Sequence, residues 1–399
     1  MYLMTQNTFH SQWTSHINLG PDGKPILTGE KLAILHRAVL EQCDAADGVK
    51  DGLISDPLAC HFNPGVTECK PGQDTASCLT PEQVAIARDI YTGAHDSEGN
   101  KLTPGGMLPG SELAWQGFGG PPGGNGGPPG GNGPAPGGNP GGNGPPPGGN
   151  GPPGGNAPRG DAGVNGMANG AYKYLAYETN PPETASVKDM KFDRASFDAT
   201  TKLHGLYDAT DADLSPFAAH GGKLILFHGL ADPQISPVGT ISYYTQMQQL
   251  MGKPAVDKFA RLYLLPGVGH CDGGGGPDQV DLLGALMAWV EDAQAPYALT
   301  AAHLPPGSGP RSGGGYDWMK VPQVPTVTPD RTRPVYPYPL TAKYVGTGST
   351  DDAKNFVAGQ PSPASENVAG KWLGSSFYAP HQELWCTGSG AAMSCKKTP

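Results

Sequence analysis

Apolar residues recur at helical spacing in two segments of the N-terminal part of the chain. Residues 30–42, EKLAILHRAVLEQ, place apolar side chains three and four positions apart, which predicts an amphipathic helix with Thr28 as its N-cap. Residues 79–94, LTPEQVAIARDIYTGA, repeat this pattern, with Thr80 as the N-cap and Pro81 at the first helical position. The segment between them is rich in cysteine and aspartate, which is typical of a loop.

The pattern changes after residue 215, where short apolar runs alternate with amphipathic segments. Strand, helix, strand and helix are predicted, in this order, at residues 224–227, 239–252, 262–265 and 279–296. This order predicts an α/β fold with a parallel β-α-β unit, in which both strands end at the same edge of the sheet. Asp232 lies in the loop after the first strand and His270 in the loop after the second. We therefore expect the two side chains to lie close together.

An acid and a histidine after successive parallel strands match the last two members of a hydrolase triad. In α/β-hydrolases the triad follows the chain order serine, acid, histidine. The acid orients the imidazole, and the imidazole takes the proton of the serine hydroxyl. The alternative is that Asp232 caps a turn and that His270 is an ordinary loop histidine. The strand placement and a spacing that fits one helix and one strand favour the catalytic interpretation.

A low-complexity segment interrupts the chain. Residues 119–157 consist of PPGGNG-like units without periodic apolar residues, and they account for many of the 61 glycines and 43 prolines. The absence of a strict Gly-X-Y period excludes collagen, so we expect a disordered insertion inside one domain. Trp115 and Phe118 lie just before it, and either residue could contact a substrate or pack in a core.

The charge balance excludes two classes of partner. Lys and Arg number 26 against 36 Asp and Glu, which gives a formal net charge of −10. A nucleic acid or an anionic membrane surface would require a basic face, so neither is expected as a partner. The sequence contains no apolar run long enough to span a bilayer.

The cysteines indicate disulfide bonds. Six of the seven cysteines form three couples that are close in sequence, namely Cys43 and Cys60, Cys69 and Cys78, and Cys386 and Cys395. Cys271 is the seventh. Zinc sites use tighter spacing with nearby histidines, so local disulfides are the better interpretation, and they are typical of a secreted or periplasmic protein. The first residues, MYLMTQNTFHSQW, nevertheless lack the charged and apolar regions of a signal peptide.

Several segments resemble one family. LILFHGLADPQISP, LYLLPGVGHCDGG and LMAWVEDAQAP look like the tannase and feruloyl esterase family of secreted α/β-hydrolases, which includes mono(hydroxyethyl) terephthalate hydrolases. CDAADGVKDGLISDPLACHFNP resembles the calcium-binding lid loop of that family, and RTRPVYPYPLTAKYVGTGSTDDAKNF resembles its C-terminal segment. Together these segments cover most of the chain outside the insertion and the C-terminal tail.

The resemblance implies roles at the predicted site. It makes Asp232 the acid and His270 the base, and it implies that Cys271 is bonded to a cysteine that precedes the nucleophilic serine. The family carries this serine in a Cys-Ser-x-Gly-Gly turn ahead of the lid, and this sequence has neither that turn nor a Gly-x-Ser-x-Gly motif. The chain is therefore expected to be N-terminally truncated, with its nucleophile in a missing segment upstream of Met1, and to be inactive by itself.

The aspartate-rich loop is the candidate metal site. Asp44, Asp47 and Asp51 crowd around two glycines, and their carboxylates repel one another unless a cation neutralises them. Calcium binds carboxylate and backbone carbonyl oxygens, and the resemblance supplies the carbonyls of Val49 and Leu53. We therefore expect Ca²⁺ as a cofactor. The alternative is a solvated Asp/Gly turn.

These inferences define an expected domain plan. It consists of a remnant of the hydrolase core at residues 1–29, a lid with disulfides and calcium at 30–215, the C-terminal part of an α/β-hydrolase sheet at 216–365, and a tail with a cysteine pair at 366–399. Two strands of a larger sheet would expose an apolar edge, so the chain alone is expected to fold poorly.

Two functions from different classes follow. The first is a carboxylic ester hydrolase of the serine type, acting on small aromatic esters of the gallate or ferulate kind, with the missing N-terminal segment as its partner. The second is a non-catalytic secreted calcium-binding module that retains hydrolase features. The intact loops around Asp232 and His270 favour the first.

Overall fold

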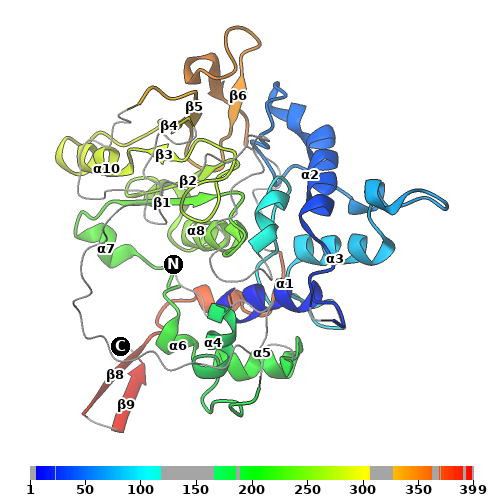
Figure 1. The fold of residues 1–399 in the computed structure, drawn as a ribbon. Helices are drawn as coiled ribbons and strands as arrows, with labels where there is room; N and C mark the ends of the chain where they lie inside the picture. Colours follow the sequence, from blue (N-terminus) through cyan, green and yellow to red (C-terminus); the bar gives the residue numbers. More distant parts are fainter. Residues whose placement is uncertain are drawn as a thin grey trace, which may run out of the picture.

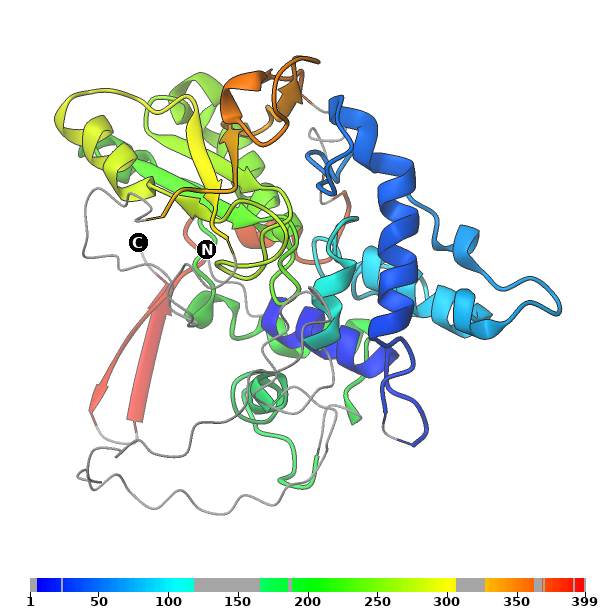
Figure 2. The ribbon, with the colours of Figure 1, turned by 45° about the horizontal axis from the view of Figure 1, so that its top comes forward.

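The computed structural model describes residues 6–22, 24–117, 166–185, 189–305, 327–361, 368, 370–389 and 392–397. The predicted insertion at 119–157 and Phe118 lie outside the described residues. Helices dominate one side of the molecule, and strands with their flanking helices form the other side (Figure 1). Figure 2 shows the same division after rotation, with α2 on the side of the molecule away from the parallel strands.

The N-terminal helices agree closely with the periodicity of the sequence. A π-helix, η1, precedes three α-helices, α1, α2 and α3, which span Gln6–His10, Ser11–Ile17, Gly29–Cys43 and Pro81–Thr92. Thr80 and Gln83 form a capping box at the start of α3, with Pro81 at its first position, as predicted. Thr28 is the N-cap residue of α2, as predicted, although its side chain makes no capping hydrogen bond.

Helices α2 and α3 are joined by a core of their own. Leu32 and Leu35 of α2 pack with Val84 and Ile90 of α3, and Trp115 lies in the same cluster. Short 3₁₀ helices η2, η3, η4 and η5 connect this region, at Asp44–Asp47, Pro64–Thr67, Thr75–Ser77 and Glu112–Gly117. Because Trp115 is 2% exposed and its indole N–H donates to Ser111, it packs in the core. The packing alternative for Trp115 is therefore the one that the structure supports.

The predicted β-α-β unit is present. Its strands β1 and β2 pair in parallel around helix α8, with bounds Leu224–Gly229, Ala260–Leu265 and Pro237–Met251. Both strands are two residues longer than predicted. The short helix α9, Lys253–Val256, leads into β2. Within the described residues no other strand pairs with β1, so its second edge is open there.

The helix predicted at residues 279–296 is shorter than expected. It begins at Leu282, where the side chain of Asp281 accepts a hydrogen bond from the N–H of Gly284, and ends at Glu291 as α10. The two residues before the cap form strand β3, which pairs with β4 and, through it, with β5, at Gln279–Val280, Leu299–His303 and Arg331–Val335. This antiparallel sheet was not predicted.

The remaining elements surround these layers. Helices α4, α5, α6 and α7 span Gly166–Tyr174, Arg194–Thr201, His204–Tyr207 and Ser215–Ala219. The two strand pairs β6–β7 and β8–β9 are antiparallel, at Ala342–Tyr344, Phe356–Ala358, Leu384–Ser389 and Ala392–Lys397, and the 3₁₀ helices η7 and η9 lie at Ala353–Asn355 and Ser375–Tyr378. The pair β8–β9 projects away from the rest of the molecule (Figure 1). The largest core cluster joins η1, α1, α5 and α8 with β2.

Disulfides tie the loops of the helical part. Cys43 is bonded to Cys60 and Cys69 to Cys78, in the predicted couples. In the tail, Cys386 is disulfide-bonded and lies opposite Cys395 in the β8–β9 ladder. None of the described helices has both the length and the apolar character that crossing a bilayer requires.

Candidate active site

The loops that follow β1 and β2 are held against each other by backbone contacts. The N–H of Leu230 donates to the carbonyl of Leu265, and the N–H of Ala231 donates to the carbonyl of Val268, both at 2.9 Å. Gly229 ends β1 where the two loops meet, and a Cβ atom there would lie 2.4 Å from the carbonyl oxygens of Val268 and Gly269. Glycine at this position therefore permits the close approach of the two loops.

This approach brings Asp232 and His270 together. Oδ2 of Asp232 lies 2.9 Å from Nδ1 of His270. Oδ1 of Asp232 accepts the backbone N–H groups of Gln234 at 2.8 Å and Ile235 at 3.0 Å. Asp232 is 3% exposed, whereas the side chain of His270 is 36% exposed. A buried, fixed carboxylate thus holds one nitrogen of a partly exposed imidazole.

His228 is a second imidazole on the same carboxylate, and the sequence reasoning missed it. Its Nε2 lies 3.2 Å from Oδ2 of Asp232 and 3.1 Å from the carbonyl oxygen of Ile235. Its Nδ1 lies 2.7 Å from Oγ1 of Thr240, in the first turns of α8. The sequence carries a signal for this contact, because His228 stands at the end of β1, four residues before Asp232.

His10 lies behind the acid and was also missed. Its ring is completely buried, and neither ring nitrogen has a hydrogen-bond partner among the described residues. Burial lowers the pKa of His10 to about 4, although the charge of Asp232 and the Pro233 carbonyl act in the opposite direction. No sequence signal joins residue 10 to the loop after β1, since η1 lies far away along the chain.

The charges at the site follow from these contacts. Burial alone would raise the pKa of Asp232, but the hydrogen bonds from His228 and His270 outweigh it and hold that pKa well below its ordinary value. The hydrogen bond to Asp232 raises the pKa of His270, against the opposing effect of partial burial. The site therefore carries an ionised acid and an imidazole that binds a proton more readily than a free histidine.

Cys271 directly follows His270 in the loop. It is exposed, not disulfide-bonded within the described residues, and has a left-handed backbone with φ of 67°. Burial, and then the charges of Asp232 and Asp272, raise the pKa of its thiol. Cys271 is therefore a thiol at neutral pH in this structure.

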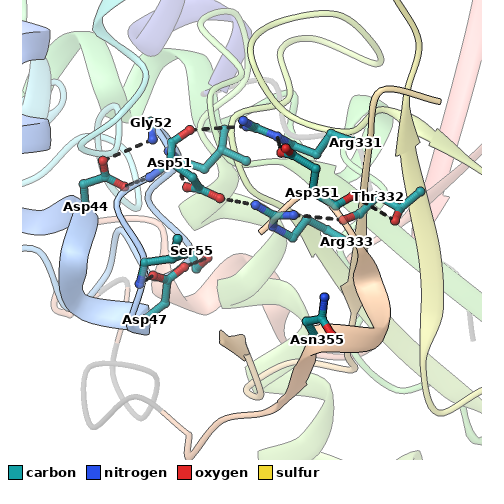
Figure 3. Close-up of polar contacts among 12 residues, drawn as sticks. Asp44, Asp47, Asp51, Gly52, Ser55, Arg331, Thr332, Arg333, Asp351 and Asn355 are labelled. Atoms are coloured by element: carbon teal, nitrogen blue, oxygen red, sulfur yellow. Dashed lines mark hydrogen bonds and ion pairs between the residues drawn. The ribbon is translucent and has the colours of Figure 1, made fainter. Parts of the chain in front are cut away.

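The aspartates of the predicted metal loop accept hydrogen bonds from the loop itself (Figure 3). Asp44 accepts the backbone N–H groups of Asp51 at 3.2 Å and Gly52 at 3.1 Å. Asp47 accepts the N–H of Val49 at 3.1 Å and the hydroxyl of Ser55 at 2.6 Å. These bonds close the loop around Gly48 and Gly52, whose φ angles of 96° and 81° favour glycine.

Asp51 connects this loop to strand β5. Its Oδ1 accepts the N–H of Leu53 at 3.2 Å, and its Oδ2 pairs with Nη2 of Arg333. Both side chains of this ion pair are buried, at 7% exposure for Arg333 and 4% for Asp51. Arg331 adds a hydrogen bond from Nη1 to the carbonyl of Asp51 at 3.3 Å and pairs with Asp351 at 3.0 Å. Figure 3 shows both arginines reaching from β5 to the loop.

The carboxylate and carbonyl oxygens of this loop are of the kind that calcium binds, but the acidic side chains do not converge on one point. Within the described part of the chain, no three His, Cys, Asp or Glu side chains are arranged to hold a metal ion. Burial raises the pKa of Asp47, and the charges of Asp51 and Asp44 add to this effect, so repulsion among the carboxylates is not fully relieved. Carboxylates with nearby backbone carbonyls are ligands that calcium prefers.

A parallel β-α-β unit with an acid and a histidine after its strands is the arrangement of an α/β-hydrolase. Two comparisons with solved structures support that fold. An esterase from Aspergillus oryzae matches with a TM-score of 0.65 and 24% identity, covering 89% of this chain and 62% of that one. A tannin acyl hydrolase from Aspergillus niger matches with a TM-score of 0.62 and 17% identity, covering 95% and 61%.

The chain belongs to the tannase and feruloyl esterase family, whose profile matches residues 2–358. It is 30% identical over 396 residues to a mono(2-hydroxyethyl) terephthalate hydrolase of Piscinibacter sakaiensis, covering 90% of this chain and 58% of that protein. It is 29% identical over 325 residues to a probable feruloyl esterase B-1 of Aspergillus flavus, covering 74% and 52%. Because the chain spans little more than half the length of these relatives, the matches establish the family and not the activity of the whole protein.

Proposed function

We propose that this chain supplies the acid and the base of a serine-type carboxylic ester hydrolase, with Asp232 as the acid and His270 as the base. The observation that carries the proposal is the 2.9 Å contact between Oδ2 of Asp232 and Nδ1 of His270. Family membership supports ester hydrolysis as the reaction. No serine in this sequence stands in a nucleophile motif, so the nucleophile is proposed to come from residues outside this sequence.

The geometry supports a defined path for the proton. Because Nδ1 of His270 is held by Asp232, Nε2 is the nitrogen that can take the proton of a serine hydroxyl as its oxygen attacks the ester carbonyl. The tetrahedral intermediate then expels the alcohol, which receives that proton from Nε2. Water repeats the sequence on the acyl-serine and releases the carboxylic acid. The charge of Asp232 stabilises the imidazolium in both halves.

We propose small aromatic esters as the substrates. The names of the relatives support this class, since they act on a terephthalate ester or on feruloyl esters. The two disulfides of the helical part support action in an oxidising compartment, outside the cytoplasm.

The activity can be tested by restoring the nucleophile. The coding sequence upstream of Met1 is read for an in-frame Cys-Ser-x-Gly-Gly segment, and this segment, or that of a family relative, is joined to the chain. We expect hydrolysis of methyl ferulate, methyl gallate or mono(2-hydroxyethyl) terephthalate that His270→Ala abolishes. Hydrolysis unchanged by His270→Ala, or no hydrolysis by a folded joined protein, would contradict the proposal.

We also propose that the loop formed by Asp44, Asp47, Val49, Asp51 and Leu53 binds calcium. The burial of Asp47, with the charges of Asp51 and Asp44 beside it, supports a cation in this loop. Calcium added to chelator-treated protein should raise the unfolding temperature as its concentration rises, because it binds the folded state. Asp47→Asn should remove the shift, and the same substitution at Asp74, an aspartate on an exposed turn of the same region, should keep it. No calcium-dependent shift in the parent protein would refute this site.

The alternative of a non-catalytic calcium-binding module separates from the esterase in the same experiments. It predicts calcium-dependent stability without ester hydrolysis after the nucleophile segment is restored. A non-catalytic module would have no evident use for the contact between Asp232 and His270, so the esterase is the function that the geometry supports best.

A further inference from the structure

Asp232 is contacted by two imidazoles, and the proposed mechanism uses only one of them. We propose that His228 is a positioning residue, which donates to the same oxygen of Asp232 that binds His270, shares the charge of that oxygen, and is itself held by Thr240. This inference rests on the proposed function, because it gives the second imidazole a task in the same acid–base pair. It adds a residue to the site that neither the strand pattern nor the hydrolase triad requires.

The neighbours of His228 determine which of its nitrogens carries the proton. Nε2 faces Oδ2 of Asp232 at 3.2 Å and the carbonyl oxygen of Ile235 at 3.1 Å, and both of these atoms are acceptors. Nε2 must therefore carry a hydrogen and donate it. Nδ1 is then free to accept the hydroxyl hydrogen of Thr240, at 2.7 Å. In this arrangement both ring nitrogens of His228 have a hydrogen-bond partner, with Nε2 as the donor and Nδ1 as the acceptor.

The carboxylate is fixed on both of its oxygens as a result. Oδ1 accepts two backbone N–H groups, from Gln234 and Ile235, while Oδ2 accepts from His228 and His270. Rotation of the carboxylate would break bonds on both sides. The donor from His228 also draws charge from the oxygen that binds His270, which limits how strongly the acid attracts the proton of the imidazole.

Of the groups around Asp232, His228 is the one that can modulate the charge of Oδ2. Among the described residues, three titratable groups face Asp232 besides His270: His228 from β1, His10 from η1 and Cys271 from the loop after β2. Neither His10 nor Cys271 donates a hydrogen bond to Asp232 among the described residues, and the charge of Asp232 acts to raise the pKa of both. Asp272, in the same loop, acts on His270 by raising its pKa. Among these groups, His228 is the one that donates to Oδ2 alongside His270.

The test measures imidazole titration by NMR in the ¹⁵N-labelled 399-residue chain, without any need for catalysis. In His228→Phe, the pKa of His270 should rise by roughly 0.7 unit, the equivalent of one ordinary hydrogen bond, because Oδ2 no longer shares its charge. In His228→Gln, whose amide can donate from nearly the same place, the pKa of His270 should stay within roughly 0.2 unit of the parent. An unchanged pKa of His270 in a folded His228→Phe protein overturns the proposal, since a residue that only fills space would alter stability alone.

Thr240→Val keeps the test decisive if His228→Phe does not fold. This nearly isosteric change removes the hydroxyl that bonds Nδ1, so the ring of His228 is no longer held against Oδ2 of Asp232 and the pKa of His270 should shift upward. An unchanged pKa of His270 in Thr240→Val would overturn the proposal. His303→Phe serves as the control, because His303 pairs with Asp330 on another sheet and should leave His270 unchanged.

A separate variant distinguishes this proposal from the function on which it rests. Asp232→Asn should lower the pKa of His270, because the hydrogen bond to the charged carboxylate is what raises it. If Asp232→Asn leaves that pKa unchanged, the acid–base pair itself fails. If Asp232→Asn lowers it but His228→Phe and Thr240→Val have no effect, the pair stands and the role of His228 fails.

Discussion

Gly229 is the residue that allows the loops of Asp232 and His270 to meet. A Cβ at this position would overlap two carbonyl oxygens of the second loop. We expect Gly229→Ala to lower the free energy of unfolding by about 1–3 kcal/mol, the usual cost of an added methyl group in a closely packed place. Urea denaturation measures this change. Gly275→Ala in the same loop is the matched control, because a Cβ there meets nothing within 4 Å, and an equal loss in both variants would contradict the account.

His10 predicts how stability depends on pH. Its pKa is about 4 in the folded protein and close to the ordinary 6.5 in the unfolded chain, so the unfolded state binds a proton first as the pH falls. Above pH 6.5 the protonation of His10 therefore does not affect the free energy of unfolding. As the pH falls toward 4, that free energy decreases by about 3 kcal/mol in total. Partial burial also lowers the pKa of His16, so this residue reduces stability at low pH in the same way. The pH dependence of each variant is therefore compared with that of the parent protein.

Unfolding free energies at pH 4, 5, 6 and 7 test this dependence. His10→Leu should flatten the loss over that range, whereas His220→Leu, on an exposed turn, should retain it. A parent and a His10→Leu protein with parallel pH curves would show that His10 is not a buried neutral imidazole.

Sequence reasoning reached Asp232 and His270 because each follows an apolar strand, and parallel strands end at one edge. It could have reached His228, whose four-residue spacing from Asp232 is visible in FHGLADP. It could not have reached His10, since no periodicity relates η1 to the loop after β1. The role of Arg333 opposite Asp51 was equally hidden, because the two residues are 282 positions apart.

At the scale of elements, the ion pair between Asp51 and Arg333 fastens the aspartate loop to β5. Arg333→Met should destabilise the protein by about 3–5 kcal/mol, because it leaves a buried carboxylate without its partner. Adding Asp51→Asn should recover part of this loss, as measured by urea unfolding. Lys253→Met breaks a pair that is largely exposed and should cost less than about 1 kcal/mol. Equal losses in Arg333→Met and Lys253→Met would contradict a buried pair at the loop.

Elements with a clear period could be predicted, whereas short strands in irregular sequence could not. The capping box of α3 and the order β1, α8, β2 follow from local patterns. Strand β3 has two residues and sits inside a helical period, so periodicity assigned it to a helix. Strand β5 contains Pro334, which lacks the N–H of a central strand residue and argues against a strand from sequence alone. Both strands depend on pairing with β4, which is a tertiary contact.

At the scale of the whole molecule, the open edge of β1 has a consequence for folding. The side chains of Leu224, Ile225 and Phe227 are partly exposed, and no described strand pairs with that edge. Open apolar edges promote association, so the 399-residue chain should associate with rising concentration and unfold over a broad range of urea. Light scattering and urea titration measure both. A monomer with a sharp, reversible transition would show that the edge is well tolerated.

The acid–base pair is the central claim, and its most direct test is kinetic. In the chain joined to a Cys-Ser-x-Gly-Gly segment, Asp232→Asn should lower kcat for an aromatic ester by about 10⁴-fold with little change in KM, because the imidazole loses its orienting charge. Asp272→Asn, in the loop that carries His270, should keep kcat within about tenfold of the parent. A kcat for Asp232→Asn within about tenfold of the parent would contradict the assignment of Asp232 and His270 as the catalytic pair.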